Sequence, residues 1–340
     1  MSRKRTLLLA LLLLPFVQAR PLLAHGSHGG GGDVPEAGEF NFTPVITIEG
    51  RGGFENNLED DPKHYALDGL FGGVFQWGLG SGGSLSIEAA VGPSLVWGEA
   101  EHFYGVVHTD DHHDDHDDDD HDDHDDDDHD DHDDDDHDDH DDDHDDDHAH
   151  AHDHGDTSYK RTDVRGFFQV RYAPNDRLSV SVDWKPYYVT RNQGDANRGL
   201  KNDIGAEVVW ALGDGDLNFS LGDGLESLAD GLFISLEHRQ GWESDGTWIG
   251  NYTDSRVGLG FIVGKDQINV KLDGGPRFYT PGSYSGLSQR TDFAGELEVS
   301  VPIGEATLFA HWQPTYSSVN ATGWGEGWQH HVGTGVTFSF

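Results

Sequence analysis

A tract from His108 to Asp156 is built almost entirely of aspartate and histidine. It holds 15 of the chain's 23 histidines and 30 aspartates, and it contains no lysine or arginine. Its regular part, from His113 to His140, repeats a His-Asp-Asp-His unit separated by four aspartates. Imidazole nitrogens interleaved with carboxylate oxygens are ligands for divalent transition metals, so this composition and spacing predict a metal-binding array.

Zn2+ is the ion that such an array suits best, with Ni2+ and Cu2+ as competitors. A zinc ion takes three or four nitrogen and oxygen donors, so fifteen histidines would furnish about four or five sites. Ca2+ would use the aspartates alone and leave the histidines unexplained. The chain has no cysteine and one methionine, which argues against Cu(I). The predicted metal ligands are His108, His112, His113, His116, His121, His124, His129, His132, His137, His140, His144, His148, His150, His152 and His154.

A solvated acidic spacer is the plainer interpretation of the tract, but a spacer predicts acidic residues without recurrent histidine. The formal net charge of the chain is −43, and without the thirty aspartates it is −13. The remaining chain is therefore mildly acidic. Nucleic-acid binding, which needs a basic surface, is not expected. Metal cations are the natural partners of the tract.

The beginning of the chain predicts export. A basic start is followed by an apolar run of about ten residues, from Leu7 to Phe16, which is shorter than the roughly twenty that a membrane helix needs. This pattern is typical of a signal peptide. We expect the signal peptide over residues 1–19, with cleavage after Ala24 as an alternative, and a flexible periplasmic segment over residues 20–40.

From residue 41 onward, apolar and polar residues alternate between Gly/Asp/Asn turns. In residues 84–97, for example, Leu85 and Trp97 share an apolar face, and Ser86 and Glu88 share the opposite, mostly small or polar face. A period of two predicts β-strands. In a soluble β-sandwich the apolar face would point into a core. Strands of about 10–13 residues, aromatic residues near strand ends and charges of both signs on the polar face instead favour an all-β, transmembrane antiparallel β-barrel.

We expect twelve strands within a barrel over residues 41–340. Their approximate ranges are 41–53, 64–77, 84–97, 163–173, 178–190, 200–212, 231–242, 252–263, 267–279, 291–303, 306–316 and 330–340. An even number returns both ends of the barrel to the periplasm, so the longer connections are extracellular. The longest, over 98–162, carries the His/Asp tract as a long disordered loop. An additional strand within 213–230 would make fourteen strands the alternative.

The C-terminal sequence resembles the last strand of Gram-negative outer-membrane barrels. Val332, Val336 and Phe338 alternate with polar or small residues, and the chain finishes on Phe340. The resemblance implies that the barrel-assembly machinery recognises this strand through Phe340. It also implies a location in the cell outer membrane, with membrane lipid as a partner.

A second set of ligand-type residues is expected inside the barrel. Alternation makes His311, His331, Glu296 and Glu298 point into the lumen, where they could relay a metal ion that passes through. Ion pairs that fill, stabilise and narrow the lumen are the simpler interpretation of these residues, and it is favoured.

Catalysis finds no support in the sequence. There is no nucleophile elbow, P-loop or HExxH, nor the Ser/His/Asn arrangement of outer-membrane phospholipases, so we expect no enzyme activity. Outer-membrane barrels with His-rich loops resemble proteins tied to zinc acquisition. This resemblance implies a porin-like barrel whose surface loop captures divalent metal, Zn2+ first, and assists its uptake. The alternatives are a surface metal sink that the barrel merely anchors, and an adhesin that uses the acidic loop.

Overall fold

The computed structural model describes residues 35–57, 63–98, 100–103, 106–109, 159–192, 198–221, 225–264, 268–282, 289–320 and 325–340. The predicted signal peptide and most of the predicted flexible segment therefore lie outside the described residues. The described strands are β1 (Phe40–Glu55), β2 (Lys63–Gly80), β3 (Gly83–Gly98), β4 (Ala100–Phe103), β5 (Val106–Thr109), β6 (Tyr159–Asn175), β7 (Leu178–Val189), β8 (Gly199–Ala211), β9 (Asp216–Leu221), β10 (Leu225–Glu243), β11 (Trp248–Val263), β12 (Ile268–Pro281), β13 (Arg290–Ile303), β14 (Ala306–Ser317) and β15 (Gly327–Ser339). These residues contain no helix long and apolar enough to span a membrane.

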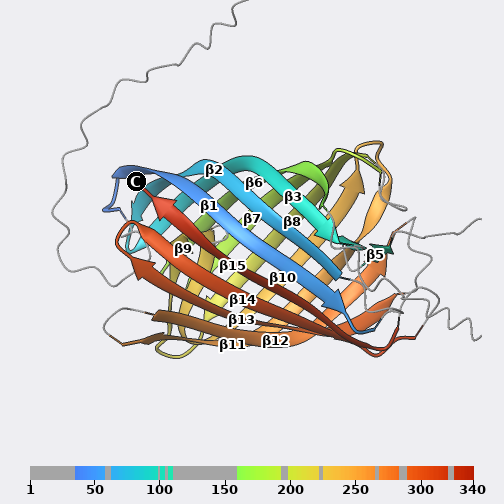
Figure 1. The fold of residues 1–340 in the computed structure, drawn as a ribbon. Helices are drawn as coiled ribbons and strands as arrows, with labels where there is room; N and C mark the ends of the chain where they lie inside the picture. The colour runs from blue at the N-terminus through green and yellow to red at the C-terminus, as the bar shows by residue number, and fades with distance from the viewer. Residues whose placement is uncertain are drawn as a thin grey trace, which may run out of the picture.

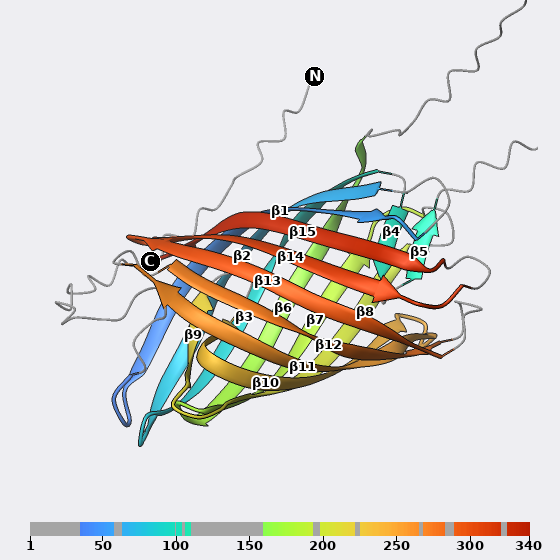
Figure 2. The same ribbon diagram turned by 90° about the horizontal axis from the view of Figure 1, so that it is seen from below.

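Twelve of the described strands close into one antiparallel barrel (Figures 1 and 2). They follow one another around the ring in chain order, without β4, β5 and β9, and β15 pairs with β1 to complete the ring. At this seam the hydroxyls of Thr47 and Thr337 share a 2.8 Å hydrogen bond on the inner side. Closure leaves the wall without a sheet edge, which is the condition for a sheet in lipid. The predicted all-β barrel of twelve strands is confirmed.

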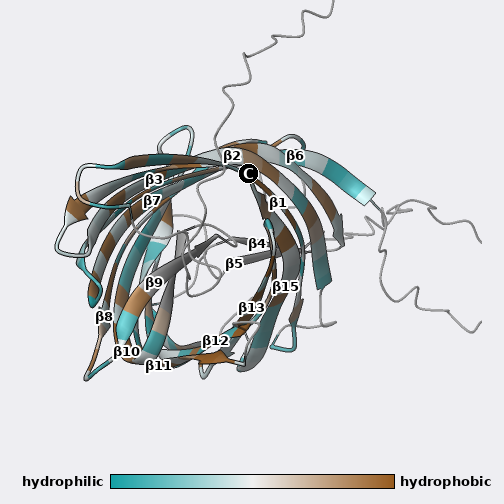
Figure 3. Cartoon of the chain, turned by 90° about the vertical axis from the view of Figure 1, so that its left-hand side faces the viewer, coloured by the Kyte–Doolittle hydropathy of each residue, from teal (hydrophilic) through white to brown (hydrophobic). Residues whose placement is uncertain are grey.

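The two faces of the wall differ as the alternation predicts. Outward side chains are apolar and accessible, as at Val257 (58% exposed), Leu272 (54%) and Phe293 (62%). Inward side chains are polar or charged and buried, as at Asp68 and Arg239. Figure 3, which colours the barrel by hydropathy, shows both kinds of residue alternating along its strands. Because the apolar face points outward, a sandwich with an apolar core is excluded.

The segment 213–230 forms a strand, but that strand does not enter the barrel wall. β9 pairs with only the first residues of β10, 225–230, whereas the rest of β10 pairs with β8 and β11. At Gly231 the backbone takes a φ of 94°. The Ala229 carbonyl then lies so close to the inner face of Gly260 that any Cβ there would collide with it. The hairpin therefore folds inward (Figure 3), and the alternative of fourteen wall strands is wrong.

An apolar cluster holds this hairpin against the inside of the wall. Leu217 and Ala229 of the hairpin are buried with Val209, Ala211 and Phe233 of β8 and β10. The N–H of Leu217 also donates to the carbonyl of Asp176, 2.5 Å away in the β6–β7 turn. One end of the lumen is therefore partly lined by apolar side chains.

The two ends of the barrel differ in the length of their connections. β2 and β3, β6 and β7, and β13 and β14 are joined by two-residue turns at the end where the C-terminus lies (Figure 1). The opposite end carries most of the longer connections, including the stretch between β3 and β6, whereas the long segment at the end where the C-terminus lies is the one between β8 and β10 that contains β9. We call the opposite end the long-loop end. The arrangement matches the predicted alternation of short and long connections.

Depth in the membrane should decide the effect of a charge on the outer face. Val257→Lys places an ammonium at mid-strand in β11, where its transfer into hydrocarbon should lower the free energy of unfolding by about 2–4 kcal/mol. Ile303→Lys, at the end of β13 and also 58% exposed, should lower it by about 1 kcal/mol or less. Denaturant titration in lipid vesicles, followed by tryptophan fluorescence, measures both. Equal losses would contradict a membrane-spanning wall.

Candidate functional site

The His/Asp tract is attached at the long-loop end, between β3 and β6. β4 and β5 form a separate two-stranded hairpin just after β3, in which His108 lies opposite Glu101. Two perpendicular views place this hairpin at the long-loop end, close to the barrel axis (Figures 1 and 2). The other fourteen predicted metal ligands lie outside the described residues. β6 begins at Tyr159, four residues earlier than predicted, which shortens the connection.

Buried ion pairs join nearby strands on the inner side of the wall. The Arg239 guanidinium lies 2.6 Å from a carboxylate oxygen of Asp183, 2.9 Å from one of Asp203 and 2.9 Å from one of Glu237. The Arg239 side chain is 3% exposed. Three carboxylates, from β7, β8 and β10, thus share one cation. Such an arrangement compensates the desolvation of each charge only while all partners are present.

A second network contains two of the predicted relay residues. Lys271 Nζ lies 3.0 Å from Glu296 and 3.6 Å from Glu298, and Arg256 lies 3.9 Å from Glu296. Gln313 also donates to Glu296 at 2.7 Å. These contacts fit the simpler interpretation of Glu296 and Glu298 as lumen-filling partners of cations. Glu298 lies opposite His311 in the register of β13 and β14, but its ion pair within the described residues is with Lys271.

The two relay histidines each face a carboxylate from β1 instead. Nε2 of His331 lies 3.5 Å from Oε1 of Glu55, and the centroids of the His331 and His64 rings are 5.4 Å apart. Nε2 of His311 lies 3.6 Å from Oε1 of Glu49. The side chains of Glu55 and Glu49 are 0% and 4% exposed. We call His331–Glu55 the outer pair, because Glu55 ends β1 at the long-loop end, and His311–Glu49 the inner pair.

The four predicted relay residues therefore do not form one group: Glu296 and Glu298 pair with cations, and the two histidines pair with other carboxylates. His311 and His331 are not brought to each other but to Glu49 and Glu55, which the sequence did not single out, and His64 joins the outer pair. The alternation of the sequence could have pointed to Glu49, Glu55 and His64, because all three lie on the polar, inward face of β1 or β2. Within the described residues, no group of three or more His, Cys, Asp or Glu side chains is arranged to hold a metal ion.

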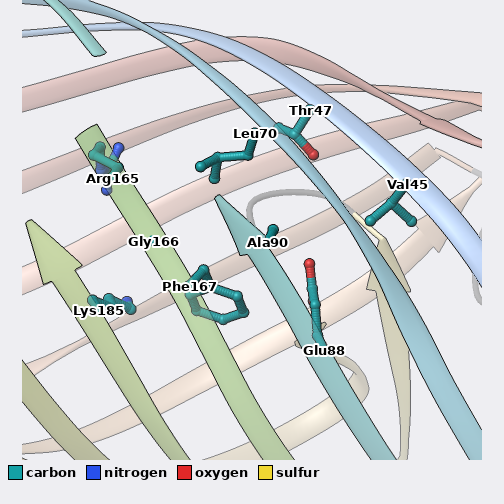
Figure 4. A pocket seen from close by; sticks show the side chains of 9 residues that line it. All are labelled: Val45, Thr47, Leu70, Glu88, Ala90, Arg165, Gly166, Phe167 and Lys185. Carbon is teal, nitrogen blue, oxygen red and sulfur yellow. The ribbon is translucent and has the colours of Figure 1, made fainter. Parts of the chain in front are cut away.

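β1, β2, β3, β6 and β7 are consecutive in the wall and bring inward side chains together. A cavity of about 30 Å³ lies there, with room for about one water molecule (Figure 4). Glu88, Arg165 and Lys185 line it together with the ring of Phe167. The cavity thus brings one carboxylate and two cations together on the inner face of the wall.

A family model described as a cyanophage outer membrane protein-like β-barrel domain matches residues 224–340, which run from the start of β10 to the last residue. No curated protein matches the chain. The match covers 117 of the 340 residues, and the apolar outer face of the wall fits the outer-membrane β-barrel that the matching model describes.

Solved barrels resemble the chain at low sequence identity. An outer membrane channel from Pseudomonas putida F1 is 10% identical, with a TM-score of 0.46 over 93% of this chain and 100% of that one. The translocator domain of the autotransporter NalP from Neisseria meningitidis is 11% identical, with a TM-score of 0.42 over 87% and 88%. The NanC porin is 9% identical, with a TM-score of 0.38 over 86% and 100%. No conclusion about cargo follows from these likenesses.

Loss of the shared cation in the first network should destabilise the barrel strongly. Arg239→Leu leaves Asp183, Asp203 and Glu237 without their common partner, and removal of one partner of a buried pair lowers the free energy of unfolding by about 3–5 kcal/mol. Arg177→Leu, at an exposed turn, should change it little. Denaturant titration of both variants in vesicles tests this. A small effect at Arg239 would show that water, not protein, solvates these carboxylates.

Proposed function

We propose that this protein is a porin-like outer-membrane barrel that captures divalent metal, Zn2+ first and Ni2+ or Cu2+ as competitors, on the His/Asp tract and assists its entry. The observation that carries the proposal is the attachment of fifteen histidines to the wall at the long-loop end. The short strands β4 and β5 lead into the tract near the barrel axis (Figure 2). Metal bound to the tract would thus be held at an entrance facing the cell exterior.

The chemistry of the tract supports capture with release. Carboxylates flanking each histidine raise the local concentration of cations, and imidazole supplies the stronger bond. Sites assembled from a long polar chain must order that chain when they bind, which lowers their affinity and speeds exchange. Moderate affinity suits the handover of metal to a pore better than permanent storage.

The barrel supports entry of ions in preference to larger solutes. Its inward face carries both signs of charge on side chains that are largely buried. A lumen of this kind passes small ions through charged constrictions. A surface sink or an adhesin needs no charged passage, so the test measures metal binding by the tract and metal entry separately.

Isothermal titration tests the tract. The full chain in detergent should bind about four or five Zn2+ through the tract at pH 7.5, and binding should weaken toward pH 5.5, because protonated imidazole cannot coordinate. Replacement of all fifteen tract histidines by asparagine keeps the aspartates and should remove this binding.

Ca2+ provides the matched control. It binds through carboxylates alone, so its titration should be the same for both chains. Fewer than two Zn2+ per chain, or Zn2+ binding that the asparagine replacement or acid leaves unchanged, would contradict a ligand role for the histidines.

A further inference from the structure

We propose that the outer pair, His331–Glu55, and the inner pair, His311–Glu49, are two binding stations for a divalent transition-metal ion inside the lumen, with the His64 ring beside the outer pair. As a pathway for metal taken up from the tract, the stations rest on the proposed function. As metal sites they stand on the geometry of the barrel interior alone.

The separation of the donor atoms is the first support. The two nitrogen–oxygen distances are 3.5 and 3.6 Å, longer than the roughly 2.7–3.2 Å of an N–H···O hydrogen bond. Two donors bound at about 2.1 Å to one tetrahedral ion lie about 3.4 Å apart. Both pairs are therefore spaced as ligands that share one ion, and one zinc ion could enter either pair with little movement of the side chains.

Two glycines provide the space for this arrangement. A Cβ at Gly53 would collide with the His64 and His331 rings, which both lie over its inner face. A Cβ at Gly333 would collide in the same way with Nε2 of His311 and with the Glu49 carboxylate. Each station thus occupies a position where the wall lacks a side chain, so two side chains from neighbouring strands can meet.

The stations follow one wall of the barrel inward from the tract. Glu55 and Glu49 are six residues apart on β1, or about 20 Å along the strand. Across the seam, Gly53 pairs with His331 and Arg51 pairs with Gly333, which in turn pairs with His311. An ion that enters at the long-loop end would therefore reach the outer pair before the inner pair.

Incomplete coordination suits passage. A pathway must bind an ion well enough to admit it and weakly enough to release it. Each pair supplies two donors at chelating distance, and water would complete the shell, as at zinc sites that keep an open position. Arg51 lies between the two stations on β1 and is paired with Asp68 at 2.7 Å. Its positive charge disfavours a tightly held cation at either station.

Co2+ binding by the full chain tests the stations once the histidines of the tract have been replaced. In the chain whose fifteen tract histidines are asparagine, visible absorption should report about two bound Co2+. His331→Asn should remove the outer ion and His311→Asn the inner one, each lowering the stoichiometry by about one. Gly53→Ala should weaken the outer ion alone, because the new methyl group displaces the rings of His64 and His331.

His238→Asn is the matched control, because His238 contacts Thr253 and Gln240 away from both pairs. It should leave both ions bound. The heat-dependent electrophoretic shift of a folded barrel should be kept by every variant that is scored. No Co2+ bound to the folded chain, or binding that neither His331→Asn nor His311→Asn reduces, would overturn the stations.

The two proposals can fail separately. If the tract binds no Zn2+ but the stations bind Co2+, capture by the tract is wrong and the lumen sites remain. If the tract binds Zn2+ as expected but the stations bind nothing, the proposal of lumen stations is wrong and capture remains.

Discussion

Closure of the sheet is the constraint on which the rest of this structure depends. A strand in hydrocarbon must give every backbone N–H and C=O a partner in the protein, and only a closed ring does so for a sheet. The seam between β1 and β15 supplies the last row of these bonds. Closure also fixes which residues face inward, because successive side chains point to opposite sides of the wall. The charged residues and histidines therefore share the interior.

Charges confined in this way need partners, and the lumen supplies most of them from neighbouring strands. Arg239 serves three carboxylates, and Lys271 lies close to Glu296 and Glu298. The His311–Glu49 and His331–Glu55 pairs differ in that an imidazole takes the place of the cation and that each pair lies over a glycine position in the wall. The same constraint thus produces ion pairs that hold the barrel and two His–Glu pairs for which we propose a metal-binding role.

Alternation allowed the wall to be predicted from the sequence, since period two is a direct consequence of strand geometry. It indicated a candidate strand within 213–230 but not its place, because an apolar alternating run such as 217–221 has the same pattern whether it joins the wall or folds inside. Gly231, where the chain turns inward, carries no periodic signal.

The alternation of inward and outward side chains likewise predicted that His311 and His331 point into the lumen, but it did not predict which residues they contact there. Their partners depend on register across the seam, where residues near the two ends of the chain become neighbours. Nothing local in the sequence sets His331 beside Glu55. The metal chemistry of the tract, in contrast, follows from composition alone and needs no fold.

Zinc entry into liposomes that contain the full chain tests most directly the claim that the tract and the barrel act together. With a zinc-sensitive dye inside and low zinc outside, the account predicts faster entry through the unaltered protein than through the chain with asparagine in place of the tract histidines. Protein orientation must be matched between the two preparations. Equal entry would contradict a role for the tract in uptake, and slower entry with the histidines present would identify the protein as a metal sink.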